Sequence, residues 1–151
     1  MYCWEYSSPV GVLLLSSNGE ALTGLAFEGS KPQGRCDRAP FSQVVEQLDA
    51  YFAGRLRHFT CPLQLVGTPF QLKVWQALQS IPYGTTWSYA QLAQAIHQPA
   101  ATRAVGLANG RNPIAIVVPC HRVIGKDGSL TGFGGGLSRK RFLLDLEQGH
   151  R

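Results

Sequence analysis

The side chains best suited to chemistry in this sequence are those of Cys120, His121 and Arg122, which directly follow Pro119. A thiol reacts as its thiolate, and a neighbouring imidazole or guanidinium lowers the pKa of a thiol. Adjacent side chains lie about 100° apart on a helix and on opposite faces of a strand, so His121 is not expected to touch the sulfur directly. The spacing therefore predicts a nucleophilic cysteine that its histidine serves through a water molecule or an unusual backbone turn.

The apolar run before the cysteine is expected to anchor it. Residues 114–118 are all apolar and are enclosed by Pro113 and Pro119, so the run suits a buried strand or loop. Pro119 also fixes φ and removes a backbone donor just before the thiol. For a Cys-His pair taken alone, the alternative is a cysteine that only packs, with His121 hydrogen-bonded in the core.

Three segments around the cysteine carry a recognisable signature. They are Ala108-Asn109-Gly110-Arg111-Asn112-Pro113, Pro119-Cys120-His121-Arg122-Val123 and Gly132-Phe133-Gly134-Gly135-Gly136-Leu137. Together they resemble the active-site signature of the O6-alkylguanine-DNA alkyltransferases, especially those of the bacterial Ogt type. The likeness is specific from about residue 69 to residue 147 and extends to earlier residues only in general layout.

The resemblance implies direct DNA repair by a suicide methyltransferase. One alkyl group, typically methyl, would pass irreversibly and stoichiometrically from O6-alkylguanine to Cys120, with O4-alkylthymine as a second candidate substrate. The damaged base would be flipped out of duplex DNA, because its target atom cannot be reached for in-line attack inside the stack. The stable thioether would end the reaction after one turnover, and no cofactor is expected.

The resemblance also assigns roles to single residues. His121 would act as a base through a water molecule, while Glu147 orients its ring. Tyr89 would donate a proton or a hydrogen bond to the departing guanine. Asn112 would fix the turn before the cysteine loop. The expected catalytic residues are Cys120, His121, Glu147, Tyr89 and Asn112; the expected substrate-binding residues are Tyr89, Val123, Phe133, Gly134 and Ser138. Each of three residues also has a plain structural alternative. Tyr89 could be an ordinary aromatic residue of a helix, Asn112 an asparagine at a helix end, and Glu147 a solvated carboxylate.

The stretch before this motif has the layout of a helix-turn-helix. Ser88 and Gln91 form a capping box that starts a helix through about His97, and a second helix is expected at about residues 100–109. Two packed helices in any α-rich domain are the alternative. The second helix is rich in small residues, which let a backbone approach a narrow minor groove. The expected partner is therefore double-stranded DNA, bound through its minor groove.

Arg103 is a long cationic side chain on that smooth helix. The resemblance implies that it fills the gap left by the flipped base, with a phosphate contact or a plain surface charge as the alternative. The expected DNA-binding residues are Arg103, Ala104, Gly106, Arg111 and Arg122. The net charge of the two halves agrees with this assignment. Residues 1–67 carry five Lys/Arg and six Asp/Glu, a net charge of −1, whereas residues 68–151 carry nine Lys/Arg and three Asp/Glu, a net charge of +6. A positively charged half suits binding to DNA, which is a polyanion.

The patterns predict two domains, with a boundary in the Pro/Gly-punctuated passage near residues 65–68. Residues 1–30 alternate like an antiparallel meander with a turn at Asn18-Gly19, and residues 41–53 read as an amphipathic helix that Gly54 caps. The fold class is an α/β N-terminal domain with a small antiparallel sheet (1–65, ribonuclease H-like by resemblance) and a mainly α winged helix-turn-helix domain (68–151). Residues 126–129 are expected to be the wing turn between two short strands, and the N-terminal half is expected only to support the site.

Other features restrict the remaining classes of protein. The four cysteines have no C-x-x-C spacing, so neither a disulfide framework nor a metal site is expected. No stretch is apolar enough to span a membrane, and we expect a cytoplasmic monomer. A lesion-binding relative is disfavoured because such a protein would carry another residue in place of Cys120. A winged-helix regulator is disfavoured because its DNA-reading helix would carry more long polar side chains. A cysteine hydrolase is disfavoured because the side chains of adjacent Cys and His residues point apart.

Overall fold

The computed structural model describes residues 1–27, 29, 31–131, 133 and 135–149. Its N-terminal part is a sheet with the strand order β3-β2-β1-β4, formed by β1 (Tyr2–Ser8), β2 (Gly11–Ser17), β3 (Leu22–Ala26) and β4 (Arg35–Cys36). The antiparallel pairing of the first three strands confirms the predicted meander. The sheet is nevertheless mixed, because β4 pairs with β1 in parallel. The strand β4 was not predicted, since two residues are too few to show alternation.

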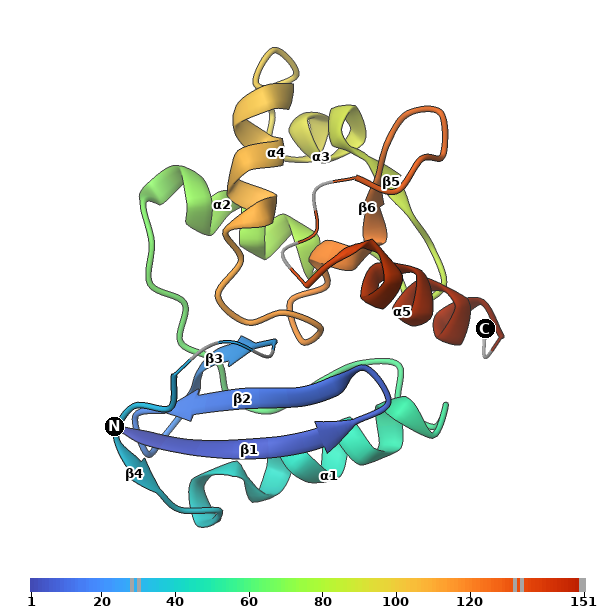
Figure 1. The fold of residues 1–151 in the computed structure, drawn as a ribbon. Coiled ribbons are helices and arrows are strands. Elements are labelled where there is room, and N and C mark those ends of the chain that lie inside the picture. The colour runs from blue at the N-terminus through green and yellow to red at the C-terminus, as the bar shows by residue number, and fades with distance from the viewer. Residues whose placement is uncertain (28, 30, 132, 134, 150–151) are drawn as a thin grey trace.

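One helix covers a face of this sheet (Figure 1). A 3₁₀ turn, η1 (Ala39–Phe41), leads into α1 (Ser42–Phe52), whose buried residues Val44, Val45, Leu48 and Tyr51 confirm the predicted apolar stripe. Gly54 has φ +76°, a left-handed conformation that favours glycine, and ends the helix as expected. The Asn18-Gly19 turn is also present, with Asn18 Oδ1 accepting from the backbone N–H groups of residues 20 and 21.

The described residues of the C-terminal part form four helices: α2 (Pro69–Leu78), α3 (Tyr89–Ala95), α4 (Thr102–Gly110) and α5 (Leu137–Gly149). Thr68 and Ser88 are the N-caps of α2 and α3, and each forms a complete capping box with the glutamine three residues later. The predicted helix start at Ser88 is therefore confirmed. Helix α3 ends two residues earlier than expected, because His97 takes a positive φ of 61° in the turn to α4.

The expected wing is only partly formed. Its turn exists, because the N–H of Gly125 donates to the carbonyl of Ser129 and the N–H of Gly128 to that of Gly125. However, β6 (Val123–Ile124) pairs in parallel with β5 (Trp87–Ser88), and no strand is assigned at residues 129–131. The prediction of a second strand after this turn is thus wrong for the described residues 129–131.

The two parts share one hydrophobic core, and the apolar run before the cysteine joins them. The N–H of Leu25 in β3 donates to the carbonyl of Pro113, and the N–H of Ala115 donates back to that of Leu25. The run is a buried loop rather than a strand, and Ile116 adopts φ +71°, a strained conformation for a β-branched residue. The N-terminal sheet therefore directly supports the loop that carries the cysteine. No helix within the described ranges has the length and apolar character needed to cross a bilayer.

Candidate functional site

Cys120 is the first residue of a short 3₁₀ turn, η2 (Cys120–Arg122), which Pro119 precedes with φ −83° and ψ 65°. The N–H of Cys120 donates to the carbonyl of Val118, and that of Arg122 donates to the carbonyl of Pro119. These bonds hold the tight turn that the sequence required. The cysteine is buried, with only 6% of its surface exposed. A substrate atom must therefore be brought to the thiol.

His121 lies fully buried beside Glu147, which approaches from α5. Its Nε2 is 2.6 Å from Glu147 Oε2, and its Nδ1 has no hydrogen-bond partner among the described residues. Burial lowers the pKa of His121, so the ring is neutral near pH 7. A neutral ring that donates from Nε2 to the carboxylate has a free lone pair at Nδ1. This nitrogen can accept a proton.

Glu147 is the most heavily bonded side chain of the site. Arg122 donates to it from Nε at 2.8 Å and from Nη2 at 3.1 Å, and the Tyr51 hydroxyl donates at 2.6 Å. Burial by itself raises the pKa of Glu147, but the bonds and charges of His121 and Arg122 outweigh it and bring that pKa to about 2. Glu147 is therefore ionised at neutral pH and can stabilise a positive charge on His121.

The structure corrects the expectation that Arg122 contacts DNA. The side chain is buried, and its remaining terminal nitrogen, Nη1, donates to the carbonyl of Ile81 at 2.8 Å. The guanidinium also stacks on the ring of Tyr83, 5.6 Å from its centroid. A guanidinium that is buried and bonded in this way has no surface left for a phosphate. Arg122 instead fixes Glu147.

Two asparagines join α4 to the cysteine loop. Asn112 donates from Nδ2 to the carbonyl of Val118 at 2.7 Å and accepts at Oδ1 from the N–H of Ile114, so it spans the turn as expected. Asn109, 1% exposed, donates to the carbonyl of Cys120 at 3.4 Å. Sequence reasoning gave Asn109 no role, although a polar side chain on the buried side of a helix of small residues was a usable signal.

The thiol lies close to a buried cation that sequence reasoning also missed. Burial raises the pKa of Cys120, while a hydrogen bond from Asn112 and the charge of Lys140 lower it. Lys140 is fully buried, and its Nζ donates to the carbonyls of Val123 at 2.6 Å and Thr131 at 2.8 Å. Burial lowers the pKa of Lys140 to about 8. The signal was present in the sequence, since Lys140 and Glu147 are seven residues apart and so lie on one helix face.

Tyr89 begins α3, and its hydroxyl is 3.2 Å from Oγ1 and 3.3 Å from the carbonyl oxygen of Thr131. Its ring lies next to α4, because a Cβ added at Gly106 would be 3.5 Å from it. Gly106 thus faces Tyr89, whereas Arg103 and Ala104 lie exposed on α4 and Arg111 lies exposed just after its end. Leu107 is 60% exposed on the same helix and was not predicted to contact DNA.

The remaining expected substrate-binding residues are spread around the loop after η2. The Val123 side chain is fully buried, so only its backbone could face a ligand. Phe133 packs edge-on against Phe27, with ring centroids 5.4 Å apart, and Ser138 is exposed near Pro9 and Val10. Gly134 lies outside the described residues. The structure therefore places Phe133 at the seam with the N-terminal part.

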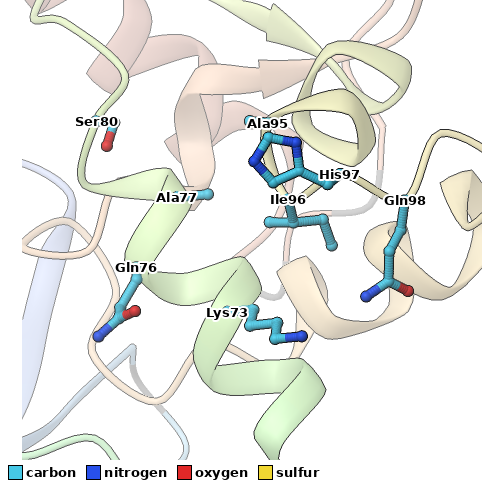
Figure 2. A pocket seen from close by; sticks show the side chains of 8 residues that line it. All are labelled: Lys73, Gln76, Ala77, Ser80, Ala95, Ile96, His97 and Gln98. Carbon is cyan, nitrogen blue, oxygen red and sulfur yellow. The ribbon is translucent and has the colours of Figure 1, made fainter.

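The structure also has a large open hollow of about 560 Å³ between α2 and the end of α3 (Figure 2). It is lined by Lys73, Gln76, Ala77, Ser80, Ala95, Ile96, His97 and Gln98. None of the expected site residues is among them. The chemistry around Cys120, and not this volume, therefore locates the candidate site.

The fold and the site define a two-part protein in which a helix-turn-helix presents a buried cysteine served by an imidazole and a carboxylate. Residues 69–149 match the family model described as 6-O-methylguanine DNA methyltransferase, DNA binding domain, and residues 1–65 match the one described as its ribonuclease-like domain. The chain belongs to the 6-O-methylguanine DNA methyltransferase family.

Curated relatives and solved structures agree with this membership. The chain is 52% identical to a methylated-DNA–protein-cysteine methyltransferase of Mycobacterium leprae, over 98% of this chain and 93% of that protein. It is 49% identical to a methylated-DNA–protein-cysteine methyltransferase of Methanosarcina acetivorans, over 97% of this chain and 98% of that protein. The crystal structure of Mycobacterium tuberculosis OGT in complex with DNA superposes with a TM-score of 0.95 at 52% identity, over 99% of this chain and 94% of that one.

Proposed function

We propose that this protein repairs alkylated duplex DNA by transferring the alkyl group from O6 of guanine to Sγ of Cys120. The observation that carries the proposal is the buried thiol beside the His121–Glu147 pair, in the half of the chain that matches a DNA-binding domain of this family. The names of the curated relatives and the DNA complex of a neighbour support it. O4-alkylthymine remains a second candidate substrate.

The proton of the thiol has a defined destination. His121 Nδ1 carries a free lone pair, and a bridging water would pass the Cys120 proton to it. The imidazolium that results is stabilised by ionised Glu147, which accepts from Nε2. Lys140 favours the thiolate by its charge. The sulfur can therefore be activated without a metal or a cofactor.

The transfer itself is an in-line substitution at carbon. Sγ forms a bond to the alkyl carbon while the bond from that carbon to O6 breaks and its electron pair moves to the guanine. The developing charge on the base is stabilised by a hydrogen bond or a proton from Tyr89. The departing base takes up one proton, from Tyr89 or from water, which balances the proton that Cys120 gives to His121. The products are then unmodified guanine and a neutral thioether at Cys120. Because the thioether does not revert, each chain reacts once.

The exposed side of α4 is the proposed DNA surface. Arg103 and Ala104 lie there and Arg111 lies just after its end, and small residues allow the helix backbone to approach the minor groove. Arg103 would occupy the gap left by the flipped base. Because Cys120 is only 6% exposed, the base must leave the duplex to reach it. The cytoplasmic location, the monomeric state, the absence of metal and the division into domains 1–65 and 68–151 stay predictions.

A titration followed by intact mass tests the proposal. Protein is mixed with an excess of duplex that carries one O6-methylguanine, and we expect a gain of one methyl group per chain that saturates at one. The Cys120→Ser variant should gain nothing. The Cys61→Ser variant is the matched control, because Cys61 is also buried but lies in the N-terminal half. Tight binding of the lesion without a change in mass would instead identify a lesion sensor.

A further inference from the structure

Tyr51 connects the N-terminal half of the protein directly to the site. It lies on α1, is fully buried, and donates from its hydroxyl to Glu147 Oε2 at 2.6 Å, across 96 residues of chain. In Figure 1, α1 belongs to the sheet part and α5 to the helical part. Sequence reasoning treated Tyr51 as a core aromatic, because it occupies a buried position of the amphipathic stripe.

The oxygen that Tyr51 contacts is the one that orients the histidine. Oε2 of Glu147 accepts from Tyr51, from His121 Nε2 and from Arg122 Nη2, whereas Oε1 accepts from Arg122 Nε. Arg122 alone would hold the carboxylate by its two nitrogens. Tyr51 adds a third direction of contact, from the opposite half of the protein, and so restricts rotation of the carboxylate about that fork.

Tyr51 itself is rigidly held. Its ring contacts Phe52, Phe59 and Tyr83, with centroid distances of 5.2, 5.4 and 6.3 Å. Burial and the neighbouring carboxylate raise the pKa of Tyr51 well above its usual value, so the hydroxyl keeps its proton throughout the working range. A donor that is both fixed and always protonated is suited to hold another group in place.

We propose that Tyr51 is a positioning residue for the alkyl transfer, because its hydroxyl holds the Glu147 oxygen that keeps His121 Nε2 protonated and Nδ1 free. The proposal rests on the function proposed above. It gives the N-terminal half a part in the chemistry as well as in support. Without the hydroxyl, Oε2 loses one of its three donors and the His121 ring loses part of its orientation.

The test compares two tyrosines that make the same kind of bond. Tyr51→Phe removes one hydroxyl from Glu147, and Tyr6→Phe removes one from Asp49, which Tyr6 contacts at 2.5 Å in the same half but outside the site. With free O6-benzylguanine as substrate, DNA binding does not enter the rate. We expect Tyr51→Phe to lower the saturating rate constant about 10-fold with little change in half-saturation, by analogy with other groups that orient a reacting histidine. Tyr6→Phe should change it less than about twofold.

A second comparison shows whether Tyr51 acts through Glu147. In a Glu147→Gln background the extra effect of Tyr51→Phe should vanish, because the oxygen that it positions has changed. The ring nitrogen resonances of His121 should also move in Tyr51→Phe and stay in place in Tyr6→Phe. Equal rate losses in the two tyrosine variants, or a full Tyr51→Phe effect in the Gln background, would overturn the proposal.

The wild-type protein provides a readout that depends neither on folding of the variant nor on repair activity. Its NMR spectrum should show a slowly exchanging Tyr51 hydroxyl proton close to a protonated His121 Nε2. A His121 ring protonated at Nδ1 instead would contradict the proposal even if Tyr51→Phe does not fold. If wild-type protein gains no alkyl group while this NMR signature is present, the proposed function fails and the positioning contact stands.

Discussion

The buried cluster behind Cys120, formed by His121, Arg122, Glu147 and Tyr51, and the exposed face of α4 both carry arginine. In the cluster this charge is buried and paired, and on α4 it is exposed. Arg122 is buried against Glu147 and Ile81, whereas Arg103 is exposed on the helix proposed to meet DNA and Arg111 just after its end. Buried charges are costly unless each has a partner, so every member of the cluster depends on the others. Exposed charges act mainly when a ligand arrives. Substitutions in the cluster should therefore affect folding and chemistry together, and those on the exposed face of α4 should affect only reactions with duplex.

The largest effect should come from Glu147→Gln. It leaves the buried Arg122 charge without its partner, and breaking a buried ion pair in this way costs about 4 kcal/mol of unfolding free energy. Alkyl transfer should slow as well, because the His121 ring loses its anionic acceptor. Urea denaturation measures the first effect. Asp145→Asn, an exposed change on the same helix, is the control, and equal stability of the two variants would contradict the dependence within the cluster.

Acid should weaken the cluster in two steps. Burial lowers the pKa of His121 below 6.5, and bonds to His121 and Arg122 overcome burial to bring the pKa of Glu147 from 4.5 to about 2. Both groups bind protons more weakly in the folded state, so stability is complete at neutral pH and falls as pH falls, first below about 6.5 and then between about 4.5 and 2. The Glu147 step is worth about 3 kcal/mol. Urea titrations at several pH values should show that second step in wild type and not in Glu147→Gln.

Arg103→Ala should separate the two regions most clearly. Losing the side chain that fills the gap should slow repair of duplex by about 30-fold, because the flipped state loses roughly 2 kcal/mol of stabilisation. Reaction with free O6-benzylguanine should stay within about twofold of wild type. Arg38→Ala, an exposed arginine of the N-terminal half, controls for charge. Equal losses on duplex and free base would remove Arg103 from the DNA surface.

The smallest effect should be that of Lys140→Met on the thiol. Removing a buried cation should raise the pKa of Cys120 further and so lower the thiolate fraction at neutral pH. The pH dependence of alkylation by iodoacetamide measures this pKa. Arg141→Met changes a neighbouring exposed cation and should leave the profile in place. An unchanged profile in Lys140→Met would show that the lysine only ties down the carbonyls of Val123 and Thr131.

Local signals predicted the helix start at Ser88 and the turns of the N-terminal half well, because each depends on few neighbouring residues. The capping box at Ser88, the Asn18-Gly19 turn and the stripe of α1 all appear as expected. Arg103 and Arg111, which were expected to bind DNA, are exposed in the structure. Such features need no knowledge of distant contacts.

The features that the sequence did not predict share one physical cause. In each case a residue or strand is contacted in the fold by a segment that is distant in the sequence. In the sequence Arg122 suggests a DNA contact, but in the fold it donates to Glu147 and to the carbonyl of Ile81. Tyr51 suggests core packing, but in the fold its hydroxyl donates to the carboxylate of Glu147 on α5. The wing suggests a hairpin, but in the fold β6 pairs with β5. Sequence spacing supplies the residues of the cluster, and only the fold supplies their partners.

The most direct test of the central claim is to locate the transferred carbon. Duplex whose O6-methylguanine carries a carbon-13 methyl group is reacted with the protein, and peptides containing Cys3, Cys36, Cys61 and Cys120 are compared by mass. We predict one labelled methyl group per chain, all of it on Cys120. Label on any of the other three cysteines, or binding of the lesion with no label on any, would contradict the assignment of Cys120 as the alkyl acceptor.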